Sequence, residues 1–274
     1  MKNILIHVPH ASMYIPEEYR RTALIPADEL EEENQFMCDT GVLELVPPVL
    51  AENVVAFPYS RLYCDVERFR DGTEPMEAYG MGFIYTHDSR GREMFQPTDA
   101  HRAEVSAVYE THHADLNRRT ASILAEHGSC LIIDLHSFSD ETVNRLFGWT
   151  DFPDVCIGTE EDYYSEEIVD GICGFCKGLG LSVALNYPYR GSLVPNQYFG
   201  KKNTGIVSVM LEINKRVLKP NPGIMGYNSG ILWGTIPHGF AELYPIRVEI
   251  VAPDATMSVP EYEIICLEGE LRYN

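Results

Sequence analysis

The chain has 274 residues, of which 45% are hydrophobic and 11% aromatic, and its formal net charge is −20 at pH 7. This content predicts a packed core rather than disorder, and the acidic balance argues against nucleic acid and anionic membranes as partners, because both need a basic surface. No run of 18 apolar residues predicts a transmembrane helix, and seven scattered cysteines favour a reducing cytoplasm over a disulfide framework.

Short apolar runs alternate with longer helical patterns along the chain. Helices are expected over 27–46, over 98–127 and over 165–180, where Gly178 or Gly180 would end the last one. The expected strands are 3–8, 54–58, 82–85, 130–135, 155–158, 182–185 and 207–213.

These strands are almost wholly apolar and are separated by helices. The sequence therefore predicts an α/β fold with a mixed, mainly parallel sheet flanked by helices on both faces. We expect this catalytic domain to span residues 1–219. Residues 220–274 carry β-like runs such as "IRVEIVA" and are expected to form a small β-rich extension packed on the domain. Because reactive groups of such folds gather beyond the carboxyl ends of the strands, the strand exits are the candidate site.

The first exit, "HVPHAS", carries two histidines. Pro9 makes His10 the start of a loop, so that its imidazole is free to point into a pocket. His7 lies within the expected strand and is assigned a role in the core or behind a ligand. The two rings point to opposite faces unless the chain turns between them.

The second exit, "FPYSRLYCDVERFRDG", crowds charged residues behind a buried strand. One interpretation is a solvated cluster whose charges pair with one another. The other is that one guanidinium grips a substrate carboxylate while a second arginine polarises a carbonyl. The charged residues concerned are Arg61, Asp65, Glu67, Arg68 and Arg70.

The third and fourth exits are "LIIDLHSFSD" and "VSVMLEIN". Asp134 lies on the same strand face as His136 and would accept its imidazole N–H, an arrangement common at zinc sites. Glu212 interrupts an apolar strand, where burial would raise its pKa and suit it as a general base; an Arg-paired glutamate is the alternative. Two imidazoles, a carboxylate and this glutamate fit hydrolytic zinc chemistry with a metal-activated water.

Five motifs give the chain a resemblance to a known family. "HVPHASMYIP", "SRLYCDVER", "DLHSF", "NYPYRGSL" and "VMLEINKRVL" occur in the order and approximate spacing of the N-formylglutamate amidohydrolase family, over roughly residues 3–219. The resemblance implies a fold similar to zinc carboxypeptidases and aspartoacylase-type deacylases, with one catalytic zinc per chain. It also implies hydrolysis of an N-acyl amino acid, in the founding case N-formyl-L-glutamate.

The resemblance assigns roles to individual residues. His10 and His136 match the zinc-binding histidines, and Glu212 matches the glutamate that activates water. Arg61 resembles the carbonyl-polarising arginine, and Arg68 the one that receives the substrate carboxylate. The residues of the "PY-x-G" turn, expected to line the pocket, are Tyr189, Arg190 and Gly191.

Two departures from the family patterns bear on the site. The carboxypeptidase pattern has a glutamate ligand three residues after the first histidine, where this chain has Met13. Asp39, in "CDTGVLEL", resembles an aspartate that formylglutamate hydrolases show ahead of a leucine-bearing helix, and the resemblance makes it the expected third ligand. The family's "D-x-N-R" reads Asp65-Val66-Glu67-Arg68 here. An ionised glutamate only accepts hydrogen bonds, so Glu67 would suit a substrate with a donor such as an amine.

Other polar groups receive simpler assignments. The segment 115–118 also matches "D-x-N-R" but lies within the long helix, where His112 and His113 are expected on the surface. Cys173 and Cys176 are expected to pack in a helix.

Two other functions remain open at this point. The first is a catalytically inactive protein that keeps the pocket and binds a small molecule or metal. The second is a metal-free serine hydrolase that uses Ser137, although no G-x-S-x-G elbow is present.

Overall fold

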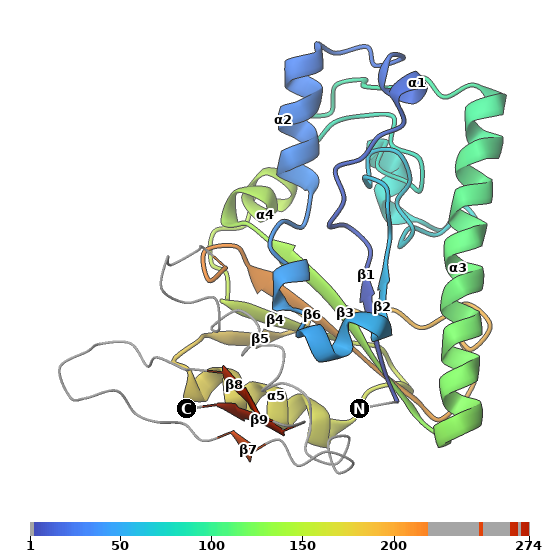
Figure 1. The fold of residues 1–274 in the computed structure, drawn as a ribbon. Coiled ribbons are helices and arrows are strands. Elements are labelled where there is room, and N and C mark those ends of the chain that lie inside the picture. The colour runs from blue at the N-terminus through green and yellow to red at the C-terminus, as the bar shows by residue number, and fades with distance from the viewer. Residues whose placement is uncertain (1–2, 219–246, 249–263, 268–269, 274) are drawn as a thin grey trace.

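Six strands of the chain form one mixed sheet (Figure 1). The computed structural model describes residues 3–218, 247–248, 264–267 and 270–273. The strand order is β2-β1-β3-β6-β4-β5, in which the first four strands run parallel, and β4 is antiparallel to β6 but parallel to β5. The strands are β1 Ile4–Val8, β2 Val54–Ala56, β3 Cys130–Phe138, β4 Val155–Thr159, β5 Val183–Leu185 and β6 Ile206–Asn214.

The helices confirm most of the expected helical segments. The long helix α3 begins after Thr98, whose side chain accepts a hydrogen bond from the His101 N–H, and it ends at Gly128 with φ +74°. The α-helices are α1 Glu17–Arg20, α2 Ala27–Met37, α3 Asp99–His127, α4 Asp140–Phe147 and α5 Glu166–Gly178. The short 3₁₀ helices are η1 Leu43–Leu45, η2 Pro48–Asn53 and η3 Pro75–Tyr79.

Helices cover both faces of the sheet, as predicted, because side chains of a strand alternate between faces. On one face Ile4, Ile6 and Val8 of β1 pack in the same apolar cluster as Ile168 and Ile172 of α5. The opposite face belongs to a cluster formed by Leu5, Ile132 and Leu116, the last of these on α3. Figure 1 shows α3 and α5 on different sides of the sheet.

Two expected elements differ from the structure. The helix expected over 27–46 ends at Met37, because Cys38 is extended and the Asp39 N–H donates to the His10 carbonyl at 2.8 Å. The segment 82–85 is not a strand: Met81 and Tyr85 form an isolated bridge across a turn. Its apolar residues are buried in a cluster that loops form together with α1, α2 and α3, so burial without alternation produced a pattern like that of a strand.

The described part of the chain after residue 219 is β-structure. Strands β7 Arg247–Val248, β8 Ile264–Leu267 and β9 Glu270–Tyr273 form a second sheet in the order β7-β9-β8. The prediction that residues 220–274 pack on the first domain concerns mostly residues outside the described ones, and it stays a prediction.

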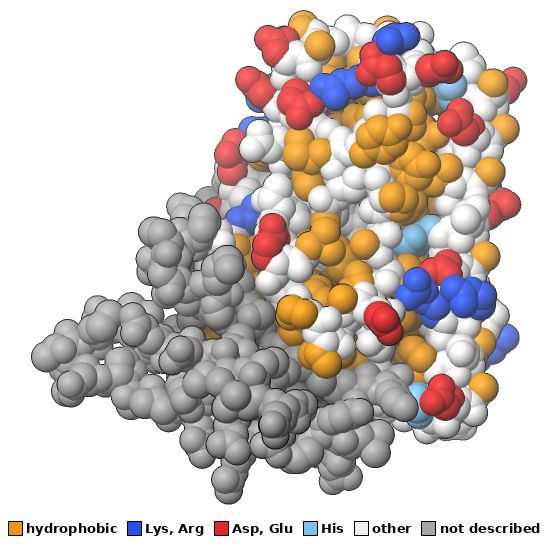
Figure 2. Space-filling model, in the orientation of Figure 1, with side chains coloured by type: hydrophobic (Ala, Val, Ile, Leu, Met, Phe, Trp, Pro, Cys, Tyr) orange, Lys and Arg blue, Asp and Glu red, His pale blue; other side chains and the backbone are white. Residues whose placement is uncertain are grey.

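The surface of the described residues mixes both signs of charge. On the face drawn in Figure 2, basic side chains lie beside acidic ones and apolar side chains separate them, so this face has no continuous basic patch. Among the described helices, none is long and apolar enough to cross a membrane.

Candidate metal centre and active site

The candidate site is built on one face of three neighbouring parallel strands. His7 of β1 lies opposite Asp134 of β3 in the strand register, and His136 of β3 lies opposite Glu212 of β6. These positions alternate with the apolar residues that face α5, so all four side chains project from the other face. Paired strands are rigid, which fixes these polar groups relative to one another.

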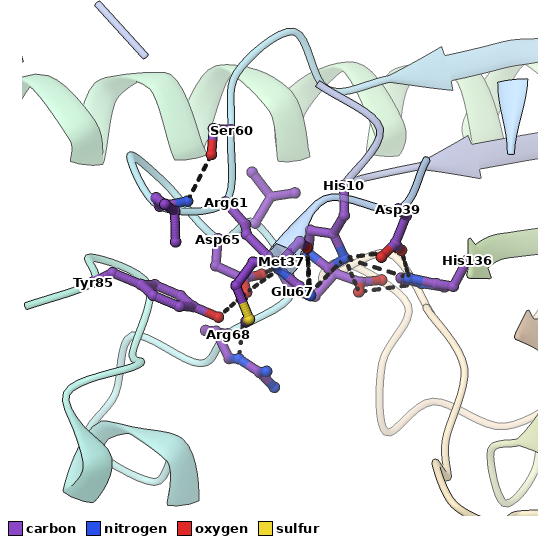
Figure 3. A network of polar contacts seen from close by, with 12 residues as sticks. His10, Met37, Asp39, Ser60, Arg61, Asp65, Glu67, Arg68, Tyr85 and His136 are labelled. Atoms are coloured by element: carbon purple, nitrogen blue, oxygen red, sulfur yellow. Dashed lines mark hydrogen bonds and ion pairs between the residues drawn. The ribbon is translucent and has the colours of Figure 1, made fainter. Parts of the chain in front are cut away.

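His10, Asp39 and His136 converge at the end of this face (Figure 3). Nδ1 of His10 lies 3.4 Å from Nδ1 of His136, which in turn lies 3.0 Å from Oδ2 of Asp39. Nδ1 of His10 lies 3.7 Å from Oδ2 of Asp39, so the three atoms form a small triangle. All three residues are at most 5% exposed. The structure thus brings together the three residues that the sequence predicted as metal ligands.

The hydrogen bonds of His10 orient its ring toward this centre. Nε2 lies 2.9 Å from Oδ1 of the buried Asp65, so the proton is assigned to Nε2 and the lone pair to Nδ1. Nη2 of Arg61 lies 2.7 Å from Nδ1 and 2.9 Å from Nε2, and with this tautomer it donates to Nδ1. A cation bound through Nδ1 would therefore require Arg61 to release this hydrogen bond and leave its guanidinium free beside the centre.

Opposing charges shift the pKa values of the cluster. Burial alone would raise the pKa of Asp39, but the two neighbouring imidazoles, His10 and His136, hold it below its ordinary value. Burial would lower the pKa of His136, yet the charges of Glu67 and Asp134 raise it well above its ordinary value. A field that favours a protonated imidazole also favours a metal cation.

Glu212 is the least compensated acid of the site. Burial raises its pKa to about 8, against the attraction of His136 and with a further increase from the charge of Asp39. Its Oε2 is buried and has no hydrogen-bond partner among the described residues. A carboxyl group with this pKa exchanges a proton near neutral pH.

A cavity of about 980 Å³ opens on these groups. Arg68 lies on its wall, with Nε 3.5 Å from Oδ2 of Asp65 and Nη1 3.8 Å from Oε1 of Glu74. These pairs leave part of the Arg68 side chain exposed to the cavity. All of the expected site residues except His10 line it: Asp39, Arg61, Glu67, Arg68, His136, Tyr189, Arg190, Gly191 and Glu212.

The turn after β5 forms the opposite wall. Gly191 has φ +85°, a left-handed conformation that favours glycine, and its carbonyl packs against Gly158 of β4 so closely that a Cβ there would lie 2.1 Å away. The Tyr189 ring packs edge-on against Phe138 of β3, with centroids 5.8 Å apart. Burial raises the pKa of Tyr189, so its phenol stays protonated.

Two histidines expected on the surface are buried. Nε2 of His112 lies 2.9 Å from Nε2 of His7, and Nε2 of His113 contacts the Val66 carbonyl at 2.8 Å. The prediction was wrong because α3 lays this polar segment over the functional face of the sheet, where the two imidazoles find partners. A helical pattern read without its neighbours does not reveal this.

The residues that the sequence suggested for other sites lie elsewhere or have structural partners. Asp115 of the second "D-x-N-R" pairs with Arg118 and Arg119 on the helix and does not line the cavity. Ser137, near the end of β3, lines the cavity and donates to the Thr40 carbonyl at 3.2 Å. Cys176 is buried in the cluster that α5 contributes to, as expected.

Asp65 is the functional residue that the sequence did not assign. It is fully buried and lies next to His10, Arg61 and Arg68, which together hold its pKa well below its ordinary value despite the burial that would raise it. In the sequence, its position between Arg61 and Arg68 in the second exit was the feature that could have identified it.

Comparisons with known proteins were made on this basis. The family model described as N-formylglutamate amidohydrolase matches residues 2–218. The crystal structure of N-formylglutamate amidohydrolase from Ralstonia eutropha JMP134 is 19% identical, with a TM-score of 0.69 over 88% of this chain and 93% of that one. A gene product from Agrobacterium tumefaciens is 20% identical, with a TM-score of 0.65 over 88% and 90%. Among curated proteins no match was found. At these identities the two structures show the shared α/β fold.

Proposed function

This chain belongs to the N-formylglutamate amidohydrolase family and is therefore an amide-hydrolysing enzyme. On this basis we propose that it is a zinc-dependent hydrolase of N-acyl amino acids. The observation that carries the proposal is the convergence of two imidazole nitrogens and a carboxylate oxygen next to Glu212, whose buried Oε2 has no partner in the described part of the chain. The motifs that predicted the family span the same residues as the family match.

The donor set fits zinc. Two imidazoles and one carboxylate are the protein ligands of many catalytic zinc sites, which keep a fourth position open. His10 Nδ1, His136 Nδ1 and Asp39 Oδ2 would hold the ion, and the carboxylate of Asp65 on His10 Nε2 is the kind of partner that orients a ligating imidazole. A zinc ion bound there would supply Lewis-acid polarisation of the amide carbonyl.

Glu212 is the proposed general base. The group must be ionised to take a proton from the attacking water and must then pass it to the leaving amine, and a pKa near neutrality suits both steps. Its position opposite His136 in the strand register places it beside the centre without making it one of the three ligands.

The arginines are the proposed substrate contacts. Arg61 would stabilise the charge that develops on the carbonyl oxygen, because its guanidinium lies against His10 at the centre. Arg68 would bind the substrate carboxylate from the cavity wall. Tyr189, Arg190 and Gly191 line the same cavity. Glu67 also lines the cavity, and its role as an acceptor for a substrate amine stays a prediction.

The alternative is an inactive protein that binds a metal or small molecule in the same pocket. The Glu212→Gln variant separates the two functions. We expect the wild-type protein loaded with zinc to release amine from N-formyl-L-glutamate or from another member of a panel of N-acyl amino acids. The variant should keep its zinc and its ligand affinity and lose about 10²–10⁴-fold in kcat.

The matched control is Glu33→Gln. Glu33 is also a buried glutamate whose pKa is raised by burial, but it does not line the cavity. Its substitution should leave kcat within a few-fold of the wild type. If the zinc-loaded wild-type protein hydrolyses no member of the panel, the hydrolase proposal fails and the binding protein stands.

A further inference from the structure

A second group of buried metal-ligating side chains lies behind the candidate centre. It consists of His7, Glu67 and Asp134, which offer one nitrogen and two carboxylate oxygens within 4.8 Å of one another. Nδ1 of His7 lies 2.8 Å from Oδ1 of Asp134 and 3.6 Å from Oε1 of Glu67. His7 and Asp134 are at most 2% exposed.

A buried nitrogen that has no hydrogen-bond partner among the described residues is directed at this group. Nε2 of His136 lies 3.2 Å from Oδ1 of Asp134 and 3.3 Å from Oε2 of Glu67, but it forms no aligned hydrogen bond with either. The other nitrogen of this ring faces the His10–Asp39 side of the site. His136 therefore separates the two groups and presents one nitrogen to each.

Glu67 lies between the two groups in a similar way. Its Oε1 is the oxygen near His7, whereas its Oε2 lies 3.7 Å from Nδ1 of His10 and near His136. Figure 3 shows the Glu67 carboxylate between His10 and His136. A carboxylate that presents one oxygen to each of two ligand sets is the geometry of a bridge between two cations.

Neighbouring groups hold His7 and Asp134 in position. His112 contacts Nε2 of His7 at 2.9 Å, which leaves Nδ1 directed at the cluster. Oδ2 of Asp134 accepts the Leu193 N–H at 3.0 Å, which leaves Oδ1 directed the same way. Partners on the far side of a ligand fix ring orientation and tautomer at metal sites.

The charges of the region leave room for more than one cation. Five buried or half-buried carboxylates of the two ligand sets and their neighbours lie beside two guanidinium groups, so one divalent cation leaves a net negative charge on these side chains when the imidazoles are neutral and Glu212 is ionised. The other charged residues that line the cavity are two acids and two bases, whose charges balance: Glu74, Glu160, Arg190 and Lys215. The carboxylates are Asp39, Asp65, Glu67, Asp134 and Glu212, and the guanidinium groups are those of Arg61 and Arg68.

From these contacts we propose that His7, Glu67 and Asp134 form a second divalent-cation site, which makes the centre dinuclear. The mixed nitrogen and oxygen donors suit Zn²⁺ or Mn²⁺ rather than Ca²⁺. Glu67 bridges the two ions, and His112 acts as a positioning residue for His7. The inference rests on the proposed function only in taking His10, Asp39 and His136 as the first site.

The competing explanation is that His7, Asp134 and Glu67 merely support His136 through hydrogen bonds. Metal stoichiometry distinguishes the two. The full chain is stripped with a chelator, reloaded with Zn²⁺, desalted and analysed by mass spectrometry of the metal. We expect about two Zn²⁺ per wild-type chain and about one for Glu67→Gln and for His7→Gln, with Glu33→Gln unchanged at about two.

Anomalous scattering at the zinc edge gives a measurement that needs no variant. Two peaks, one at each ligand set, would support the dinuclear centre. A single peak at His10, Asp39 and His136, with one Zn²⁺ in both the wild type and Glu67→Gln, would overturn it and leave the proposed hydrolase intact. If the wild-type protein retained no zinc, both the dinuclear centre and the proposed zinc-dependent hydrolase would be rejected.

Discussion

At the scale of single residues, Glu212 links the stability of the protein to pH. Folding raises the pKa of this carboxyl from 4.5 to about 8, because burial penalises the charged form. The folded state then binds the proton more tightly than the unfolded state. The stabilisation by this group is complete below pH 4.5 and is lost as the pH rises through about 8.

The Glu212→Gln variant lacks this pH dependence, because glutamine does not ionise. In metal-free protein we expect the free energy of unfolding of the variant, measured relative to that of the wild type, to rise by up to about 5 kcal/mol between pH 5 and pH 9. Denaturant titrations at several pH values in the presence of a chelator measure the difference. The control, Glu126→Gln, removes an exposed carboxylate on α3 and should show a flat difference. A flat difference for Glu212→Gln as well would contradict the raised pKa.

Arg68 offers a second prediction at this scale. Its fork-shaped guanidinium can bind a carboxylate through two parallel hydrogen bonds, whereas lysine offers a single point charge. Arg68→Lys should therefore raise KM for an N-acyl amino acid about 10- to 100-fold with a smaller change in kcat, as measured by steady-state kinetics.

The neighbouring Arg70 provides the control. It stacks on Phe83 and Tyr109, pairs with Glu110 and does not line the cavity. Arg70→Lys should leave KM within a few-fold of the wild type. Equal values of KM for the two lysine variants would remove Arg68 from the substrate site.

At the scale of secondary-structure elements, the contact between β4 and the turn after β5 shapes the pocket. A Cβ at Gly158 would lie 2.1 Å from the Gly191 carbonyl and 2.4 Å from the Met210 side chain, so the turn would have to move. We expect Gly158→Ala to cost about 1–3 kcal/mol of stability and to raise KM, because Tyr189 and Gly191 lie on the cavity wall.

Gly174→Ala is the matched substitution on α5. None of the described residues lies within 4 Å of the Cβ position there, and the residue is inside the helix, so we expect a gain of about 0.5–1 kcal/mol and unchanged kinetics. Thermal unfolding and steady-state kinetics of both variants provide the measurement. Equal stability of the two alanine variants would show that the turn adjusts without cost.

The elements also show which local signals are reliable. The expected ranges 98–127 and 165–180 match α3 and α5 closely, because the signals that begin and end a helix, such as Thr98 and Gly128 of α3, act within one helix. The end of α2 was missed because Asp39 leaves the helix to meet His10, a contact between segments that are distant in the sequence. The apolar segment 82–85 was misassigned for the same kind of reason, since helices and loops that are distant in the sequence bury it.

At the scale of the whole molecule, the described site and the six-stranded sheet lie within residues 3–218. We therefore expect a chain that ends at residue 219 to keep its far-UV circular dichroism, its cooperative unfolding and its zinc content. If the extension packs on the domain as predicted, the melting temperature should fall by about 2–4 °C for each kcal/mol that the contact contributed. If the shortened chain aggregated or bound no zinc, residues 220–274 would instead be required for the catalytic domain to fold.

The sequence by itself determined the fold class, the family and the strand exits that carry the chemistry. These depend on local spacing: the period of two placed Asp134 and His136 on one face, and apolar strands separated by helices indicated a covered sheet. Motif order added the family, which the match over residues 2–218 confirms.

Only the tertiary structure decided which of these residues meet. Asp39 and His136 are 97 positions apart, and His7 and Asp134 are 127 apart, so no local pattern encodes their contact. The burial of His112 and the position of Glu67 between two ligand sets likewise depend on how α3 and the loop after β2 pack on the sheet. Strand register and packing bring these segments together, and side-chain chemistry acts only once they are adjacent.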